Sequence, residues 1–304
     1  MRLLGREGTV RVPDYGNPTV RRRRLAAELR RLRELAGLTG DKVAERLGWS
    51  GSKVSRIETH RTGVKLADLG KLLELYGVSE SHRAELMALA GESHSRGWWE
   101  AYSDTLPEEY AAYIVLEAEA EAALYWSPEI VHGLFQTKDY AREVIHAHME
   151  STSTIPPGEV ERRVETRLRR QDLLAGDRPL VLSVVLDESV LLRQFGGKPV
   201  MRQQLERLIQ ISEKPNVRLQ ILPLAGAHPI GTGAFTLLKF GALPGVGRPS
   251  DVVYIEQLSR NALYIEQEAE TFQYSQAFAR LTAASLNPPQ SRDLIARIAR
   301  EAWS

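Results

Sequence analysis

The sequence predicts a multidomain protein in which an all-α N-terminal domain precedes a larger domain of mixed α/β, or α+β, class. Three observations predict this fold class. The chain has 304 residues, which is more than one small domain needs. Apolar residues recur at helical spacing up to about Leu89, whereas strand-like runs begin only at Leu180. A polar hinge bounded by glycines, Gly91–Gly97, lies between the two regions.

The composition is that of an ordinary globular protein and excludes several classes. Apolar residues make up 43% of the chain and charged residues 26%. No apolar run approaches the ~20 residues that a membrane helix needs, and the first residues lack the apolar core of a signal peptide. Because the chain has no cysteine, disulfides and thiolate metal sites are excluded. We expect a cytoplasmic protein that does not associate with membranes.

The charge is distributed unevenly, although the net charge is only +1. Residues 1–91 contain 18 Lys and Arg against 11 Asp and Glu, a net charge of +7. Residues 92–304 contain 22 against 28, a net charge of −6. This asymmetry is expected when only one domain meets phosphate groups, and it also arises by chance segregation of surface charge. Charge alone therefore leaves both interpretations open.

The first ninety residues are predicted to form an arm and a helical domain. Residues 1–19 contain three Gly, two Pro and scattered arginines, and we expect a flexible arm. A helix is expected from Val20, because leucines recur on one face, and Gly37 is its stop signal. Further short helical segments follow to about Leu89, which makes about five helices in residues 20–91.

The segment Leu38–Glu58 predicts two short helices that cross through a tight turn. Thr39 is a good N-cap for the first helix, and Ser50 is one for the second. Gly48 stands where a helix end favours a left-handed residue, and Trp49 is an apolar plug in the turn. The residues expected to face inward are Val43, Ala44, Leu47, Val54 and Ile57. This pattern is a helix-turn-helix.

The outward face of the second helix carries side chains that can contact base edges. In a helix-turn-helix, the N-terminal half of this helix enters the major groove. Arg binds guanine O6 and N7 in bidentate fashion, and Ser donates to or accepts from any base. We expect Ser52 and Arg56 to contact bases. Lys53 is expected to contact a base or a phosphate, and Gly51 to let the backbone approach closely.

The segment from about Val20 to Leu89 resembles the XRE-type, lambda-repressor-like family of helix-turn-helix regulators. The matches to the family pattern are Leu38-Thr39, Val43-Ala44, Gly48-Trp49-Ser50 and Val54-Ser55-Arg56-Ile57-Glu58. The resemblance covers about a quarter of the chain and implies a transcriptional regulator that binds duplex DNA sequence-specifically. From the residues themselves we expect no cofactor and no metal. A single module of this size contacts few bases, so we expect a homodimer on a pseudo-palindrome.

The chain departs from the family pattern at two places. The Gln that opens the first motif helix in the family is Gly40 here, and the loop Thr59-His60-Arg61 lacks the usual Gly. The resemblance also implies an ion pair between Arg33 and Glu58. We expect this pair to be structural, and to contribute at most ~1 kcal/mol if it is exposed.

Phosphate contacts are expected from basic side chains and from the starts of the two motif helices, where N–H groups are free to bind anions. The candidates are Thr39, Gly40, Lys42, Ser50, Arg61 and Lys65. The run Arg21-Arg22-Arg23-Arg24 either clamps the DNA backbone or enters a minor groove together with the arm. A solvated helix start is the alternative interpretation of that run.

Residues 98–304 are predicted to form the larger α/β domain, with a regulatory or interaction role. Helices are expected over Pro107–Leu124, Lys138–His148, Pro157–Leu174, Lys198–Ile211, Gln267–Ser285 and Pro289–Ala302. Strands are expected over Leu180–Leu186, Val217–Leu222, Ala234–Phe240, Val252–Ile255 and Ala262–Ile265. The last three strands follow one another closely, which favours antiparallel hairpins.

Residues 96–303 resemble the C-terminal domain of actinobacterial, antitoxin-like transcriptional regulators. The matching strings are Gly97-Trp98-Trp99, Leu106-Pro107, Tyr113-Ile114, Leu116–Ala120, Val131–Ala141, Val217–Pro223 and Gly233-Ala-Phe235. The family has Pro where this chain has His132. The resemblance implies a small partner protein encoded nearby, and it supplies no catalytic residues.

The residues of this domain form no convincing catalytic or metal-binding pattern, and we expect no enzyme. His146 and His148 would diverge by about 200° on a helix and could not share a metal ion. Asp187-Glu188 is either an acid–base pair or the cap of a following helix. The glycine pairs 231/233 and 245/247 lack the third glycine of a nucleotide fingerprint, so both are predicted loops.

Three roles remain open for this domain. The first is dimerisation together with capture of a small protein. The second is a pocket for a small-molecule effector. The third is an enzyme fused to a DNA-binding domain.

Overall fold

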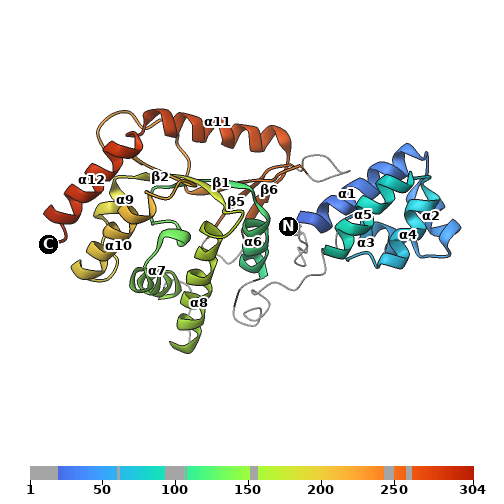
Figure 1. Ribbon diagram of the computed structural model, residues 1–304, viewed down its shortest axis with the longest axis horizontal. Helices are drawn as coiled ribbons and strands as arrows, with labels where there is room; N and C mark the ends of the chain where they lie inside the picture. Colours follow the sequence, from blue (N-terminus) through green and yellow to red (C-terminus); the bar gives the residue numbers. More distant parts are fainter. Residues whose placement is uncertain are drawn as a thin grey trace, which may run out of the picture. The chain divides into compact units, whose positions relative to one another are not determined.

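The computed structural model describes residues 20–59, 62–92, 106, 108–150, 157–242, 250–257 and 262–304. The predicted arm, most of the hinge, Arg61 and the glycine pair 245/247 lie outside the described residues. The chain divides into two compact units, Met1–His94 and Ser95–Ser304 (Figure 1). Each unit has its own core, and each is described by itself.

The N-terminal unit is all-α in its described residues, as predicted. Its helices are α1 (Val20–Leu35), α2 (Gly40–Leu47), α3 (Gly51–Glu58), α4 (Leu66–Leu75) and α5 (Glu80–Glu92). The helical spacing of leucines buries Leu25 and Leu29 of α1, and Leu69, Leu73 and Leu86 of α4 and α5 are buried as well. Gly37 has a φ of +67°, which ends α1 in the left-handed conformation that glycine adopts without strain.

The C-terminal unit is built on a mixed six-stranded sheet. The strands are β1 (Ala122–Ser127), β2 (Val181–Asp187), β3 (Val217–Leu222), β4 (Phe235–Lys239), β5 (Val252–Ile255) and β6 (Leu263–Ile265). Their order across the sheet is β3-β2-β1-β4-β5-β6. β1, β2 and β3 are parallel, and β4, β5 and β6 join as antiparallel neighbours, which confirms the predicted hairpins.

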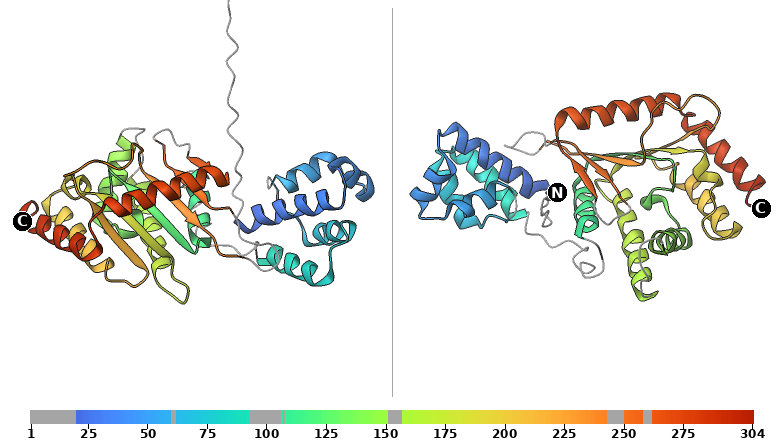
Figure 2. Two further views of the ribbon diagram at one scale, coloured as in Figure 1. Left: turned by 90° about the horizontal axis from the view of Figure 1, so that it is seen from above. Right: turned by 180° about the vertical axis from the view of Figure 1, so that it is seen from behind.

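Helices cover both faces of this sheet (Figures 1 and 2). The helices of this unit are α6 (Glu108–Glu119), α7 (Lys138–Glu150), α8 (Pro157–Arg169), α9 (Ser189–Leu192), α10 (Lys198–Ile211), α11 (Glu268–Ala284) and α12 (Pro288–Glu301). α6, α7, α8 and α10 lie on one face, and α11 crosses the other. Phe278 and Leu281 of α11 pack on Trp126, Phe235 and Val253 of the sheet.

The helix predicted over Pro107–Leu124 is wrong in its last five residues, 120–124. The helix ends at Glu119, and Ala122–Ser127 forms β1, which pairs with β2 on one side and β4 on the other. The Ala-rich sequence favours a helix locally, but a strand in the middle of the sheet buries Trp126 completely. Pairing on both edges therefore outweighs local propensity here.

Other differences are small. The helix expected to reach Leu174 is α-helical only to Arg169, and a 3₁₀ turn, Arg170–Leu174, continues it. The short helix α9 was not predicted as a separate element. No helix among the described residues has both the length and the apolar character required to cross a membrane.

Candidate nucleic-acid interface

The predicted helix-turn-helix is formed by α2 and α3 with the predicted caps in place. The Thr39 hydroxyl accepts a hydrogen bond from the Lys42 N–H (3.3 Å), and the Ser50 hydroxyl accepts one from the Lys53 N–H (3.3 Å). Gly48 ends α2 with a φ of +66°. These three residues therefore fix where both helices begin and where the first one ends.

The inward and outward faces of the motif lie as the sequence predicts. Val43, Ala44, Val54 and Ile57 are buried between the helices, and Leu47 is half-buried. Trp49, the residue in the turn, is also only half-buried, so it forms part of the surface and is not a core plug.

Ser52 and Arg56 are exposed, one turn apart, on the outer face of α3. The Ser52 hydroxyl lies 3.0 Å from that of Ser50, and the Arg56 Nε donates to the Ser52 carbonyl (3.2 Å). Arg56 therefore folds back along its own helix, with the guanidinium at the surface. Gly51 is exposed, and a Cβ added to it would lie 3.2 Å from Asp41 Oδ1, so α2 and α3 begin close together.

Lys53 is placed differently from the other three base-contact candidates. Its ammonium lies 2.9 Å from Asp68 Oδ2 of α4 and 3.7 Å from the centroid of the Trp49 ring. The side chain is therefore held sideways, between the turn and α4. It has to leave Asp68 before it can contact a base or a phosphate.

Arg33 and Glu58 form the predicted pair in bidentate geometry. Arg33 Nε and Nη2 donate to the two Glu58 oxygens at 2.7 and 3.0 Å, and Nη1 donates to the Leu38 carbonyl at 2.8 Å. The two side chains are only 13% and 11% exposed, so this is no surface pair. The hydrogen bonds from Arg33 to Glu58 raise the pKa of Arg33. The pair joins α1 to the end of α3.

The phosphate candidates are only partly brought together. Lys42 and Lys65 are exposed, at the start of α2 and just before α4. The side chains of the caps Thr39 and Ser50 accept hydrogen bonds from the N–H of the third residue of each helix. The N–H groups of the first residues, Gly40 and Gly51, therefore remain available to an anion. Arg21–Arg24 lie in the first turns of α1, but their side chains, like Arg61, are outside the described part of the chain.

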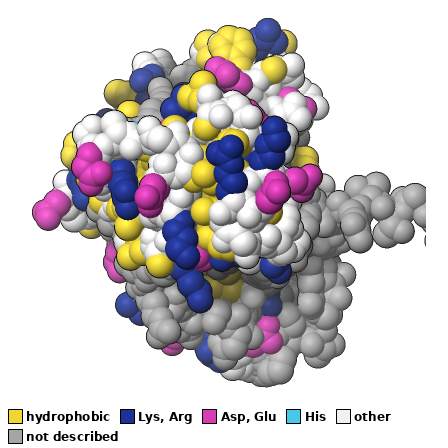
Figure 3. Space-filling view, turned by 90° about the vertical axis from the view of Figure 1, so that its right-hand side faces the viewer, with side chains coloured by type: hydrophobic (Ala, Val, Ile, Leu, Met, Phe, Trp, Pro, Cys, Tyr) yellow, Lys and Arg dark blue, Asp and Glu magenta, His cyan; other side chains and the backbone are white. Residues whose placement is uncertain are grey.

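Basic and acidic side chains are interspersed on the surface seen in Figure 3. Asp41, for example, follows Gly40 at the start of α2, and Asp68 pairs with Lys53. Contacts to phosphate therefore depend on a few individually placed cations rather than on a continuous basic patch on that face.

The C-terminal unit contains a buried ionic cluster that the sequence did not predict. Arg170 Nε and Nη2 each donate to a Glu117 oxygen at 2.8 Å, and both side chains are almost fully buried. The Tyr113 hydroxyl donates to Glu117 (2.7 Å), and Arg170 also donates to Tyr110. The partners lie 53 residues apart, and no local sequence signal joins them.

His132 lies beside this cluster. Its side chain is 4% exposed, and its Nε2 is 3.9 Å from Glu117 Oε1. Its Nδ1 accepts from the Leu134 N–H (3.4 Å), which caps a short 3₁₀ turn. Burial lowers the pKa of His132 to about 3, so the imidazole is neutral at neutral pH.

The two candidate acid–base residues, Asp187 and Glu188, accept hydrogen bonds from backbone N–H groups. Asp187 Oδ1 accepts from the Ser189 N–H (2.9 Å), and Glu188 Oε2 accepts from the Leu224 N–H (2.9 Å). Residues 231–233 form a loop, as predicted. His146 is exposed, and the side chain of His148 is outside the described part. Within the described residues, no cluster of three His, Asp or Glu side chains could hold a metal ion.

Comparison with known proteins identifies both units. A model of a helix-turn-helix domain matches residues 24–86, which makes the protein a DNA-binding regulator. No curated protein and no solved structure matches the chain. A model of a domain of unknown function, DUF5753, matches residues 110–297, which is more than half of the chain. The chain therefore belongs to the family of proteins that carry a DUF5753 domain, preceded here by a helix-turn-helix.

Proposed function

We propose that this protein is an XRE-type transcriptional regulator of the cytoplasm that binds duplex DNA sequence-specifically as a homodimer. The observation that carries the proposal is the outer face of α3, where Ser52 and Arg56 are exposed beside the capped starts of two helices. A helix start of this kind binds phosphate, and the exposed face is then directed at base edges.

Within this proposal, Ser52 and Arg56 contact bases, and Gly51 lets the backbone approach them. Lys42, Lys65 and the N–H groups of α2 and α3 position the protein on the phosphates. We propose no catalytic role for the C-terminal unit. The engagement of Asp187 and Glu188 with backbone N–H groups supports that view.

The test is selection of bound DNA from a random pool, followed by titration of the selected site. Two related half-sites are the expected outcome, because a dimer presents two α3 helices. Arg56→Ala should weaken the selected site by about 1–3 kcal/mol and relax the preference at one base position. Lys42→Ala is the matched control, because it should weaken all sequences alike and lower the salt slope by about one. A preference unchanged by Arg56→Ala would contradict the assignment.

For the C-terminal unit we propose an antitoxin-like role, in which it binds a small partner protein. Its support is the net charge of −6 over residues 92–304, which favours a basic partner, together with the resemblance described above. This role is tested by co-expressing the chain with the small protein encoded beside its gene. Native mass spectrometry then measures the mass of the purified complex bound to duplex DNA. A complex of defined stoichiometry is expected. If the two proteins fail to associate while the DNA complex forms, this role is wrong.

A further inference from the structure

The first residue of α3, Gly51, has no side chain with which to contact a base. A Cβ built on Gly51 would lie 3.2 Å from Oδ1 of Asp41, which is the second residue of α2. The Asp41 carboxylate therefore borders the space into which a side chain at the start of α3 would project. The fold thus places an acidic group from α2 beside the first turn of α3.

This carboxylate is exposed, and its charge is not neutralised within the unit. Among the described residues of the N-terminal unit, no ion pair includes Asp41. The two cations of α3 are engaged elsewhere, since Lys53 pairs with Asp68 and the Arg56 Nε donates to the Ser52 carbonyl. The Asp41 oxygens are therefore available to a hydrogen-bond donor of a ligand.

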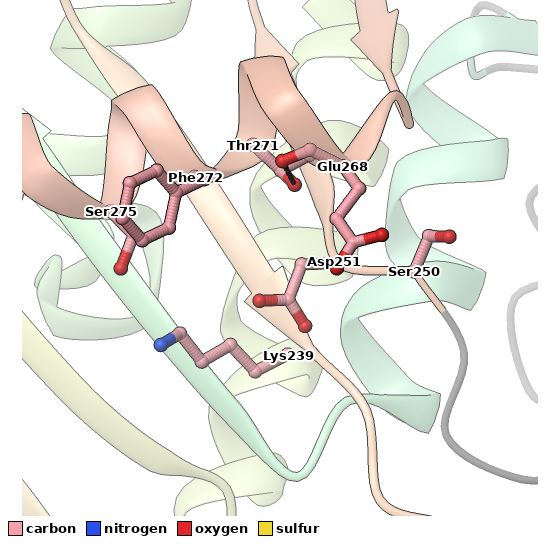
Figure 4. Close-up of a pocket in the computed structure, with 7 residues that line it drawn as sticks. All are labelled: Lys239, Ser250, Asp251, Glu268, Thr271, Phe272 and Ser275. Carbon is pink, nitrogen blue, oxygen red and sulfur yellow. Dashed lines mark hydrogen bonds between the residues drawn. The ribbon is translucent and has the colours of Figure 1, made fainter.

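The carboxylates that line a groove in the C-terminal unit are in a different situation. In the groove of about 410 Å³ shown in Figure 4, Lys239 of β4 lines the same space as Asp251 and Glu268. Charges of both signs meet there, so the groove favours no ligand charge. At Asp41 a single sign prevails, and the ligand that the neighbouring residues bind on the proposed function is known in kind.

A carboxylate at the start of α3 can bind only some base edges. In a helix-turn-helix, the first residues of the second helix meet base edges in the major groove. An ionised carboxylate accepts hydrogen bonds and donates none, and the donors in that groove are the amines of cytosine (N4) and adenine (N6). The adenine amine lies between two acceptors, its own N7 and O4 of the paired thymine, which repel a carboxylate. Cytosine is therefore the base that this position favours.

The same charge opposes the wrong contacts. Phosphate oxygens and the acceptor edges of guanine and thymine are repelled by a carboxylate, because like charges and unpaired acceptors are then brought together. Asp41 thus lowers the affinity for sequences that offer it no amine. This combination of one attractive and several repulsive contacts is what produces specificity.

We infer that Asp41 is a specificity-determining residue of the DNA interface, which accepts a hydrogen bond from N4 of a cytosine next to the start of α3. The inference rests on the proposed function, because it requires α3 to lie in the major groove. It gives α2 a contact to a base, in addition to the phosphate contacts proposed for Lys42 and the N–H groups of that helix.

The test is titration of the selected DNA site with each base in turn at every position, for the wild type, Asp41→Asn and Asp41→Ala. In the wild type, one position should favour cytosine by about five- to tenfold. Asp41→Asn should shift that preference toward adenine, because an amide contacts N6 and N7 together. Asp41→Ala should abolish the preference, and it keeps the test decisive if Asp41→Asn fails to fold.

The matched control is Glu74→Gln, which removes one exposed carboxylate near the end of α4. It should leave the preference at every position unchanged. A gain in affinity by the same factor for all sequences in both Asp41 variants would overturn the inference, because the carboxylate would then only repel phosphate. A base preference that is identical in the wild type and both variants would overturn it as well.

The same titrations distinguish failure of this inference from failure of the proposed function. If the wild type binds the selected site no better than random duplex, the proposed function fails and the role of Asp41 fails with it. If Arg56→Ala relaxes one position while the Asp41 variants change none, only the role of Asp41 fails. The positions that depend on Arg56 and on Asp41 should differ, because Gly51 begins α3 and Arg56 lies in its last turn.

Discussion

Lys53 of α3 is bound to Asp68 of α4, with 2.9 Å between Nζ and Oδ2, while its ammonium also rests 3.7 Å above the Trp49 ring. One side chain thus joins α3, the turn before it and α4. Asp68 is 19% exposed and Lys53 34%, so the pair is accessible to water and is weaker than a buried one. Phosphate therefore competes with Asp68 for the same ammonium.

The first prediction concerns this competition. Asp68→Asn should release Lys53 toward DNA, raise the affinity for non-specific duplex and steepen the salt dependence by about one unit of slope. Titration of a random-sequence duplex at several salt concentrations measures both effects. The control is Asp68→Asn combined with Lys53→Gln, which should bind no more tightly than Lys53→Gln alone. An unchanged slope in Asp68→Asn would mean that Lys53 stays on Trp49 and never contacts phosphate.

The second prediction concerns the pair between Arg33 and Glu58. Arg33→Met leaves a largely buried carboxylate without its partner, and should destabilise the N-terminal unit by about 1–3 kcal/mol. Hydrogen exchange of the α1, α2 and α3 amides measures the loss. Arg30→Met removes a pair with Glu34 whose side chains are 63% and 55% exposed, and should leave the same amides unaffected. Equal effects of the two variants would make the Arg33 pair energetically unimportant.

What could be predicted from sequence differs between the two units for a physical reason. The caps Thr39 and Ser50 and the left-handed Gly48 act within a few residues, so their patterns fix the helix-turn-helix locally. The direction in which the Lys53 side chain points depends on Asp68, which lies in another helix. The sequence pattern of α3 alone does not predict that ion pair. Local patterns thus predict which residues of α3 face outward, but not which partner each of those side chains contacts.

In the C-terminal unit, long-range pairing decides what local signals leave open. β1 is Ala-rich and short, and its identity as a strand comes from β2 and β4, of which β4 lies more than a hundred residues away. Arg170 and Glu117 likewise satisfy each other only in the folded chain. Strands flanked by clear turn signals, such as Val252–Ile255, were predicted with their correct bounds.

The third prediction concerns the buried pair of Glu117 and Arg170. Burial raises the pKa of Glu117, but the charge and hydrogen bonds of Arg170 outweigh it and hold that pKa below its usual value. Glu117→Gln leaves the buried guanidinium without a counter-charge and should cost about 3–5 kcal/mol. Urea unfolding, followed by the fluorescence of the buried Trp126, measures the loss.

Two comparisons test the cause of that loss. Replacement of both partners, as Glu117→Leu with Arg170→Met, should be less destabilising than Glu117→Gln alone, because no buried charge remains unpaired. In the wild type, the contribution of Glu117 should be present above its unfolded pKa of about 4.3 and lost as the pH falls through its lower folded pKa. A double variant less stable than Glu117→Gln would indicate that packing, not charge, dominates at this position.

The fourth prediction concerns His132, which is neutral in the folded protein because burial lowers its pKa to about 3. In the unfolded chain its pKa is near 6.5, so between these values the unfolded state binds the extra proton. The stability that depends on neutral His132 is complete above about pH 6.5 and declines as the pH falls toward 3. Each pH unit in that window removes about 1.4 kcal/mol from the free energy of unfolding.

His132→Asn separates this effect from other acid-sensitive groups, because the Asn oxygen can accept from the Leu134 N–H in place of Nδ1. Between pH 6.5 and 5, where Glu117 stays ionised, urea unfolding of the wild type should lose stability more steeply than that of His132→Asn. Near pH 7.5 the two proteins should be similar, since both keep the capped turn and neither carries a charge at this position. Identical slopes in both proteins would show that His132 is protonated as readily in the folded chain as in the unfolded one.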